Sequence, residues 1–235
     1  MARLVPLILC LLLVTPASAT IKLLVYDYPP LVQINRQAKP TGHAIDLVTP
    51  LFLQAGVQYQ FVKLPLKRAI QQAAQHKNTC TFPVFRTQRR EADFRWIGPI
   101  SVNRFGLYSL AENNHQLVTL NDAKAHKIGV YAGSAVANYL TDNGFSTYET
   151  SSIAQGLQML KHGRIEFWVA DIQSIQQASS LVGEQQLTPS LSFYTSMSFM
   201  ACNLSSDAQD LDALEAQLKT MYLTGQAQQL LHLSF

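Results

Sequence analysis

Short apolar runs alternate with helix-like segments along most of this chain, and that alternation limits the folds open to it. Residues 21–26 (IKLLVY) are an apolar run stopped by an Asp-Tyr-Pro-Pro loop, which predicts a buried strand. Residues 44–55 space their apolar side chains like a helix, and residues 57–64 alternate with a period of two. A helix over 66–76 and a strand over 79–85 continue this order. The pattern favours a mostly parallel sheet covered by helices.

The second half of the chain repeats the same order. Strands are predicted at 127–131 and 165–170, with a long strand-like run at 193–203. Helices are predicted over the ranges 136–142, 153–161, 172–180, 208–221 and 225–233. No Pro- or Ser-rich linker separates the halves, so two α/β units of about 100 residues each are expected to pack closely as two lobes.

The composition excludes several classes of protein. Of the 235 residues, 48% are hydrophobic and 14% are charged, and the net charge is +3. The chain is apolar enough for a sizeable core, and too weakly charged for a disordered segment or a nucleic-acid binder. The six histidines are scattered without metal-ligand spacing, and no strong catalytic motif is present. We therefore expect no nucleic-acid partner, no metal, no cofactor and no catalytic residue.

Residues 1–19 have the pattern of an export signal. A positive residue precedes an apolar stretch, a proline breaks that stretch, and Ala17-Ser18-Ala19 is a small-x-small cleavage site. The stretch is shorter than the roughly 20 residues of a membrane-spanning helix, although an uncleaved anchor is the alternative. We expect cleavage after Ala19 and a periplasmic mature protein.

Export leaves two cysteines, Cys80 and Cys202, in a compartment where disulfides persist. They are either two buried thiols or one bridge that closes a long loop. The residues alone leave both alternatives open.

Polar side chains follow several predicted strands, at the edge where ligands bind in open α/β sheets. The densest cluster, residues 85–96, is either a solvated charged loop or a loop that aims one guanidinium at a carboxylate. Gly133-Ser134 before a helix is either an anion site or an ordinary turn. Asp171 either binds a cationic amine or caps a helix. Tyr28 either covers a ligand or packs its loop.

Five motifs occur in a fixed order along the chain. They are Tyr28-Pro29-Pro30 with Pro40-Thr41-Gly42 and Ile45-Asp46-Leu47, then Thr87-Gln88-Arg89-Arg90, then Phe94-x-Trp96-Ile97-Gly98-Pro99, then Gly129-Val130-Tyr131-Ala132-Gly133-Ser134, and last Gly163-Arg164-Ile165-Glu166 through Asp171. In this order and spacing the chain resembles the family 3 extracellular solute-binding proteins that serve ABC importers of polar amino acids. The resemblance covers essentially the whole mature chain.

The resemblance implies a two-lobed α/β fold of the type II periplasmic-binding-protein kind. Each lobe would be a mostly parallel sheet flanked by helices, and two crossover strands would join the lobes. Lobe 1 would comprise residues 20–109 and 199–235, and lobe 2 residues 110–198. The resemblance also makes the strands of Cys80 and Cys202 neighbours, which favours the disulfide.

The resemblance further implies an ion clamp between the lobes. Arg90 would pair with a ligand carboxylate, supported by Thr87, and Ser134 with nearby backbone N–H groups would bind that carboxylate from the other lobe. Asp171 would take the ammonium group, and Tyr28 would shield the ligand. Because neither lobe alone satisfies both charges, the ligand would favour closure.

Three positions depart from the family pattern. Leu66 stands where a stacking aromatic is common, Phe85 where small polar residues are common, and Ala135 where a threonine is expected. Polar contacts to an ammonium group are therefore reduced, and a more apolar pocket is expected. Arg86 is a candidate second cation, which would favour a diacid or another anionic ligand.

These inferences predict a monomeric periplasmic protein that captures a small amino-acid-like or carboxylate solute and delivers it to a membrane ABC permease. One alternative is an exported enzyme on the same fold, similar to cyclohexadienyl dehydratases, with Glu91, Glu112 or Glu166 as its general acid. Another alternative is a soluble ligand sensor for a membrane receptor, which would use the same cleft.

Overall fold

The computed structural model describes residues 20–35, 39–110, 113, 115–179, 187 and 189–231. The predicted export signal, residues 1–19, lies outside these residues. Within the described ranges, no helix is both long enough and apolar enough to cross a bilayer.

An eight-stranded sheet runs through the molecule in the order β4-β1-β5-β10-β6-β9-β7-β8. Its strands are β1 (Ile21–Val25), β4 (Tyr59–Lys63), β5 (Thr79–Phe85), β6 (Phe94–Tyr108), β7 (Ile128–Tyr131), β8 (Thr147–Thr150), β9 (Phe167–Asp171) and β10 (Pro189–Asn203), and a separate small sheet holds β2 (Gln33–Ile34) and β3 (Pro40–Thr41). Pairing is parallel within β4-β1-β5 and within β9-β7-β8. It is antiparallel where β10 and β6 join these two groups.

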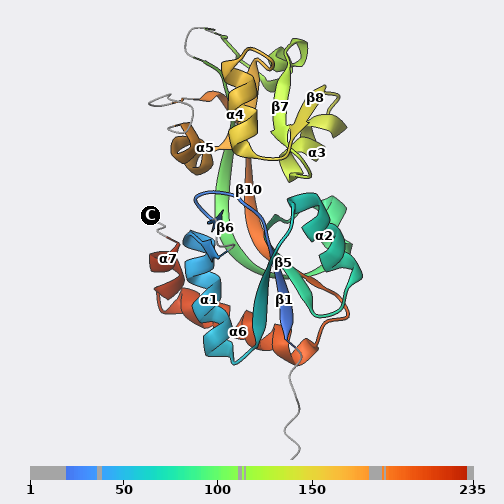
Figure 1. The fold of residues 1–235 in the computed structure, drawn as a ribbon, viewed down its shortest axis with the longest axis vertical. Helices are drawn as coiled ribbons and strands as arrows, with labels where there is room; N and C mark the ends of the chain where they lie inside the picture. Colours follow the sequence, from blue (N-terminus) through green and yellow to red (C-terminus); the bar gives the residue numbers. More distant parts are fainter. Residues whose placement is uncertain are drawn as a thin grey trace, which may run out of the picture.

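The two groups of parallel strands belong to two lobes, and β6 and β10 pass between them (Figure 1). β10 pairs with β5 through residues 198–202, while β6 pairs with β9 through residues 105–108. This arrangement confirms a two-lobed α/β fold with two crossover strands. The residue limits of the lobes given above stay a prediction.

Helices cover the sheet in each lobe (Figure 1). They are α1 (His43–Ala55), α2 (Leu66–Gln75), α6 (Ala208–Leu223) and α7 (Gln226–Leu230) in the first lobe, and α3 (Ala135–Asp142), α4 (Ile153–Lys161) and α5 (Ile172–Ser179) in the second. Helix α1 illustrates why they form: its apolar residues recur on one face, and six of them are buried. That face packs against α6 and α7.

Strand β6 is the longest element that the apolar pattern does not predict. Arg95, Gly98 and Pro99 interrupt any alternation along it. Its backbone nevertheless pairs with β10 along most of its length and with β9 at its end. Tertiary pairing therefore overrides weak local preference in this strand.

Cys80 and Cys202 form a disulfide. The two residues are direct partners in the register of β5 and β10, and both are fully buried. Of the two alternatives that the sequence left open, the structure has the bridge, which ties a lobe 1 strand to a crossover strand.

Candidate functional site

Four buried polar residues stand at or just past the ends of strands from both lobes. Tyr28 follows β1, and Arg90 lies in the 3-10 helix η1 (Gln88–Asp93) after β5. Ser134 follows β7, and Asp171 ends β9. All four are between 1% and 8% exposed. Hydrogen bonds between the lobes bring this predicted group together.

The two oxygens of the Asp171 carboxylate have different partners. Oδ1 accepts the backbone N–H groups of Gln173 and Ser174, each at 3.1 Å, and so caps the start of α5. Oδ2 accepts the phenol O–H of Tyr28 from the other lobe at 2.7 Å. The helix-cap alternative is therefore confirmed, and the second oxygen is directed across the boundary between the lobes.

Arg90 is a buried cation, and no described carboxylate forms an ion pair with it. Its guanidinium donates one hydrogen bond across the lobes, to the backbone oxygen of Gly133 at 2.9 Å. Burial lowers the pKa of the Arg90 guanidinium, and the Tyr26 and Tyr194 hydroxyls act in the opposite direction. Because a buried charge is stable only when it is paired or well solvated by hydrogen bonds, the Arg90 environment suits an anion.

Gly133 and Ser134 form the turn between β7 and α3. The Ser134 hydroxyl accepts the N–H of Ala137 at 3.2 Å, and the Ser134 N–H donates to the Tyr131 oxygen at 3.1 Å. These bonds are those of an ordinary turn before a helix, one of the two alternatives that the sequence left open. An anion could still reach the remaining backbone N–H groups in the first turn of α3. Gly133 has a φ of +77°, and a Cβ there would lie 3.1 Å from the Cβ of Lys67 in the other lobe.

Aromatic rings fill the space between these polar groups. The Tyr28 ring lies 6.4 Å from those of Phe85 and Tyr131, and Phe85 contacts Phe105 at 5.2 Å between centroids. The inner cavity that Tyr28 and Asp171 line has a volume of about 10 Å³, which is room for about one water molecule. Burial, and then the Asp171 carboxylate, raise the pKa of Tyr28 well above its usual value, so its phenol stays a neutral donor. In this conformation the protein's own side chains occupy the predicted ligand position.

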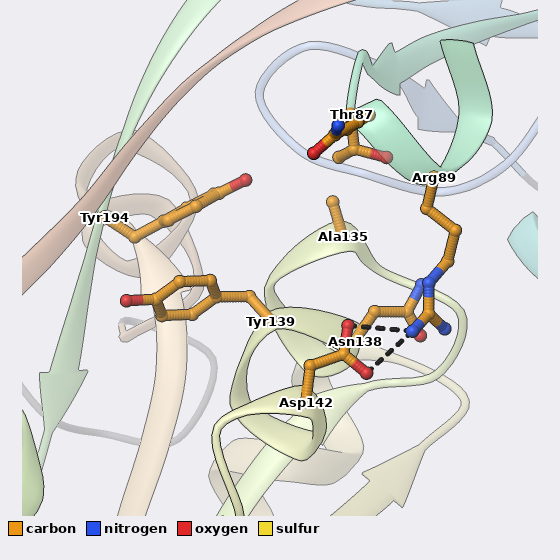
Figure 2. A pocket seen from close by; sticks show the side chains of 8 residues that line it. Thr87, Arg89, Ala135, Asn138, Tyr139, Asp142 and Tyr194 are labelled. Atoms are coloured by element: carbon orange, nitrogen blue, oxygen red, sulfur yellow. Dashed lines mark hydrogen bonds and ion pairs between the residues drawn. The ribbon is translucent and has the colours of Figure 1, made fainter. Parts of the chain in front are cut away.

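A larger outer cavity of about 480 Å³ opens between η1, α3 and β10 (Figure 2). Its lining residues are Thr87, Gln88, Arg89, Ala135, Asn138, Tyr139, Asp142 and Tyr194. The Arg89 guanidinium bonds both carboxylate oxygens of Asp142, at 2.7 and 2.8 Å, and so links the lobes beside this cavity. Thr87 and Ala135 are predicted site residues: the Thr87 backbone oxygen accepts the Arg90 N–H at 3.0 Å, and Ala135 directly follows Ser134.

Most residues of the outer cavity were missed by the sequence reasoning. Asn138, Tyr139 and Asp142 follow Ala135 at steps of three, four and seven, which places all four on one face of α3. That spacing is a signal that could have found them. Tyr194 carries no comparable signal, because only the path of β10 brings it to the cavity.

The remaining predicted residues line neither cavity. The exposed Arg86 side chain bonds Glu91 at 2.8 Å and lies over the rings of Trp96 and Phe199, so it is not brought into either cavity. Leu66 is buried at the start of α2. Phe85 is buried against Tyr28.

Two of the three candidate acids for an enzyme are also away from the site. Glu91 is exposed and pairs with Arg86. Glu166 pairs with His126 at the opposite end of β9 from Asp171. Glu112 lies outside the described residues.

Residues 22–233 match the bacterial extracellular solute-binding proteins, family 3. The chain belongs to this family. No curated protein matches it. Many solved structures share its fold.

Three of these structures illustrate the range of this solute-binding fold. A histidine kinase sensor domain with similarity to periplasmic binding proteins is 17% identical, with a TM-score of 0.81 and coverage of 90% of this chain and 93% of the other. The GluR0 ligand-binding core from Nostoc punctiforme, in complex with L-glutamate, is 18% identical, with a TM-score of 0.77 and coverage of 89% and 96%. An ancestral amino acid-binding protein, a precursor of cyclohexadienyl dehydratase, is 18% identical, with a TM-score of 0.76 and coverage of 90% and 93%. At these identities the likeness shows the shared fold.

Proposed function

We propose that this solute-binding protein captures a small amino-acid-like or carboxylate solute between its lobes. The observation that carries the proposal is a pair of buried opposite charges on facing lobes. Among the described residues, Arg90 forms no ion pair with a carboxylate and Asp171 forms none with a cation. An unpaired buried ion is destabilising by several kcal/mol. A solute that carries both a carboxylate and an ammonium group would neutralise both.

Binding would exchange contacts that the protein makes with itself. A ligand ammonium group would replace the Tyr28 hydroxyl on Oδ2 of Asp171, now held at 2.7 Å. A ligand carboxylate would replace the Gly133 oxygen on the Arg90 guanidinium, now at 2.9 Å. Because the inner cavity of about 10 Å³ is too small for such a solute, the lobes would first separate and then close on it.

The outer cavity would receive the rest of the solute. Its volume of about 480 Å³ lies beside Thr87 and Ala135. The backbone oxygen of Thr87 accepts the Arg90 N–H at 3.0 Å, and Ala135 directly follows Ser134. The rings of Tyr139 and Tyr194 lie 5.0 Å apart there, and the Asn138 amide adds a donor and an acceptor. This lining suits a side chain with an apolar or aromatic body and a polar end.

The biological role that fits this binding is uptake. We propose that the exported protein is a periplasmic monomer that binds its solute without turnover and delivers it to an ABC permease. The family match and the predicted export signal support this role. A soluble sensor for a receptor would use the same cleft, so genes for permease subunits beside this gene favour uptake, and an unpaired receptor gene favours sensing.

The direct test is calorimetry of denatured, dialysed and refolded protein against the amino acids and small carboxylates. Arg90→Ala is expected to weaken binding of any hit about a hundredfold, because losing one partner of a buried charge pair is worth about 2–5 kcal/mol. Arg86→Ala is the matched control, since this exposed arginine lines neither cavity. Equal affinity of Arg90→Ala and wild type, or no hit in either class of compound, would refute the proposal.

A further inference from the structure

Two histidines and a glutamate come together at the end of lobe 2 that lies away from the cleft. His126 precedes β7 and Glu166 precedes β9, whereas the cleft residues lie at the other ends of these strands. The four residues of β7 span roughly 13 Å at about 3.3 Å per residue. His115 joins them from the segment after β6. The cluster is therefore separate from the proposed solute site.

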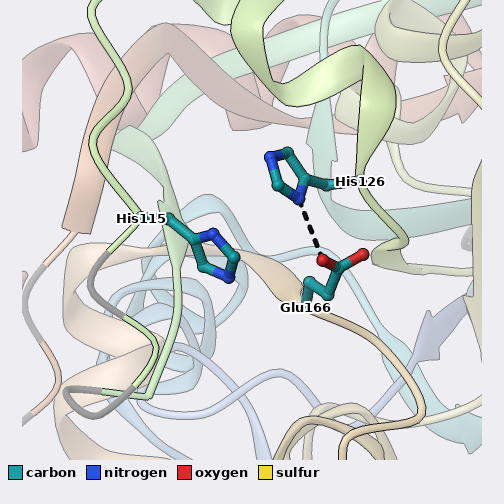
Figure 3. Close-up of side chains that lie close together, drawn as sticks. All are labelled: His115, His126 and Glu166. Carbon is teal, nitrogen blue, oxygen red and sulfur yellow. Dashed lines mark hydrogen bonds and ion pairs between the residues drawn. The ribbon is translucent and has the colours of Figure 1, made fainter.

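The three side chains lie close together (Figure 3). Nδ1 of His126 lies 2.9 Å from Oε1 of Glu166, and Oε2 of Glu166 accepts the backbone N–H of Lys127 at 2.9 Å. The His115 and His126 rings are 4.7 Å apart, and both lie against the ring of Phe167. One ligand atom from each of the three lies within 4.8 Å of the other two.

This donor set selects a class of metal ion. Two imidazole nitrogens and one carboxylate oxygen suit Zn²⁺ and its first-row neighbours, whereas Mg²⁺ and Ca²⁺ prefer oxygen ligands throughout. Ligand atoms at about 2.0–2.1 Å from one tetrahedral ion are roughly 3.3 Å apart. The His126–Glu166 separation of 2.9 Å is close to that value. All three ligand atoms lie within 4.8 Å of one another, so binding would draw the His115 ring closer to the other two.

The surroundings of the cluster also suit a metal ion. The Lys127 N–H holds the carboxylate of Glu166 in place, as outer partners of metal ligands commonly do. The His126 and Glu166 side chains are 26% and 37% exposed, so an ion and a water ligand can reach them from solvent.

We propose that His115, His126 and Glu166 bind one Zn²⁺-class divalent ion at the end of lobe 2 away from the cleft. The ion would tie the segment after β6 to the starts of β7 and β9. Sequence reasoning assigned the histidines to surface or packing roles, because the three ligands are far apart along the chain and only the fold brings them together.

Calorimetric titration of tag-free protein with Zn²⁺ tests this site. One equivalent is expected to bind. His115→Ala is expected to weaken Zn²⁺ binding about tenfold or more, because even substitution of a residue that only supports a metal ligand typically weakens metal affinity by that much. His115→Ala leaves the His126–Glu166 contact in place, so this variant is expected to fold, which circular dichroism checks. His162→Ala, an exposed histidine outside the cluster, is the matched control and is expected to bind like wild type.

A second measurement is thermal unfolding with and without metal. Zn²⁺ is expected to raise the Tm of wild type and of His162→Ala, and to raise that of His115→Ala by less at the same concentration, because stabilisation by a bound ligand falls with its affinity. Mg²⁺ at the same concentration is expected to have little effect. Equal Zn²⁺ affinity in His115→Ala and wild type, or no saturable binding to wild type, would overturn the proposal.

Discussion

The Tyr28 hydroxyl is expected to compete with the solute, and Tyr28→Phe isolates that competition. The buried phenol donates to Oδ2 of Asp171 across the lobe boundary at 2.7 Å. A hydrogen bond to a charged group contributes about 1.5–3 kcal/mol to stability. Removing it weakens the closed arrangement by that amount, while Oδ1 of Asp171 keeps its two backbone donors.

Solute affinity is therefore expected to rise in Tyr28→Phe. If the closed arrangement dominates before binding, the apparent affinity increases by the factor by which the open fraction grows. The loss of about 1.5–3 kcal/mol corresponds to roughly a ten- to hundredfold increase. Small-angle scattering of the solute-depleted variant is expected to show a larger radius of gyration than that of wild type.

The assay is calorimetry with the solute identified by the panel above. Tyr222→Phe is the matched control, because its hydroxyl donates to Pro99 at 2.7 Å within the first lobe and lines neither cavity. This control is expected to bind like wild type. A tenfold weaker affinity in Tyr28→Phe, together with an unchanged radius of gyration, would show that the phenol serves the solute rather than competing with it.

Three further predictions concern closure and stability. Replacing Cys80 and Cys202 together by alanine is expected to lower the free energy of unfolding by up to about 5 kcal/mol, because the bridge spans 122 residues. Urea titration measures this loss, and an unchanged unfolding midpoint would contradict the prediction. Gly133→Ala is expected to weaken solute binding, because its φ of +77° is strained for alanine by about 1–2 kcal/mol and its Cβ would press on Lys67; equal calorimetric affinity would argue against a closed lobe contact there. The folded-state pKa of Glu166 is depressed, mainly by its hydrogen bond to His126. The Glu166 carboxylate therefore contributes stability above its unfolded pKa of about 4.3, and this contribution is lost as the pH falls through the folded-state pKa. Acid denaturation of Glu166→Gln is expected to show a shallower pH dependence than that of wild type, and identical curves would contradict this prediction.

Local patterns were sufficient to predict most elements of this fold. The apolar runs that became β1, β5 and β7 and the helical spacing of α1 and α6 are properties of neighbouring residues. A strand or helix is visible in sequence when its own side chains alternate or recur toward one core. The family motifs likewise pointed to Tyr28, Arg90, Ser134 and Asp171, and the structure brings these four together at the lobe boundary.

The path of the crossover strands determined which residues far apart in the sequence become neighbours. β6 has no readable pattern, yet it and β10 place strands of both lobes in one sheet. That path determines which arginine is buried and whether Asp171 faces the other lobe as well as capping a helix. It also brings His115 close to Glu166. Such contacts join residues far apart in the chain, and their geometry depends on the packing of whole strands and helices, so no local spacing encodes them.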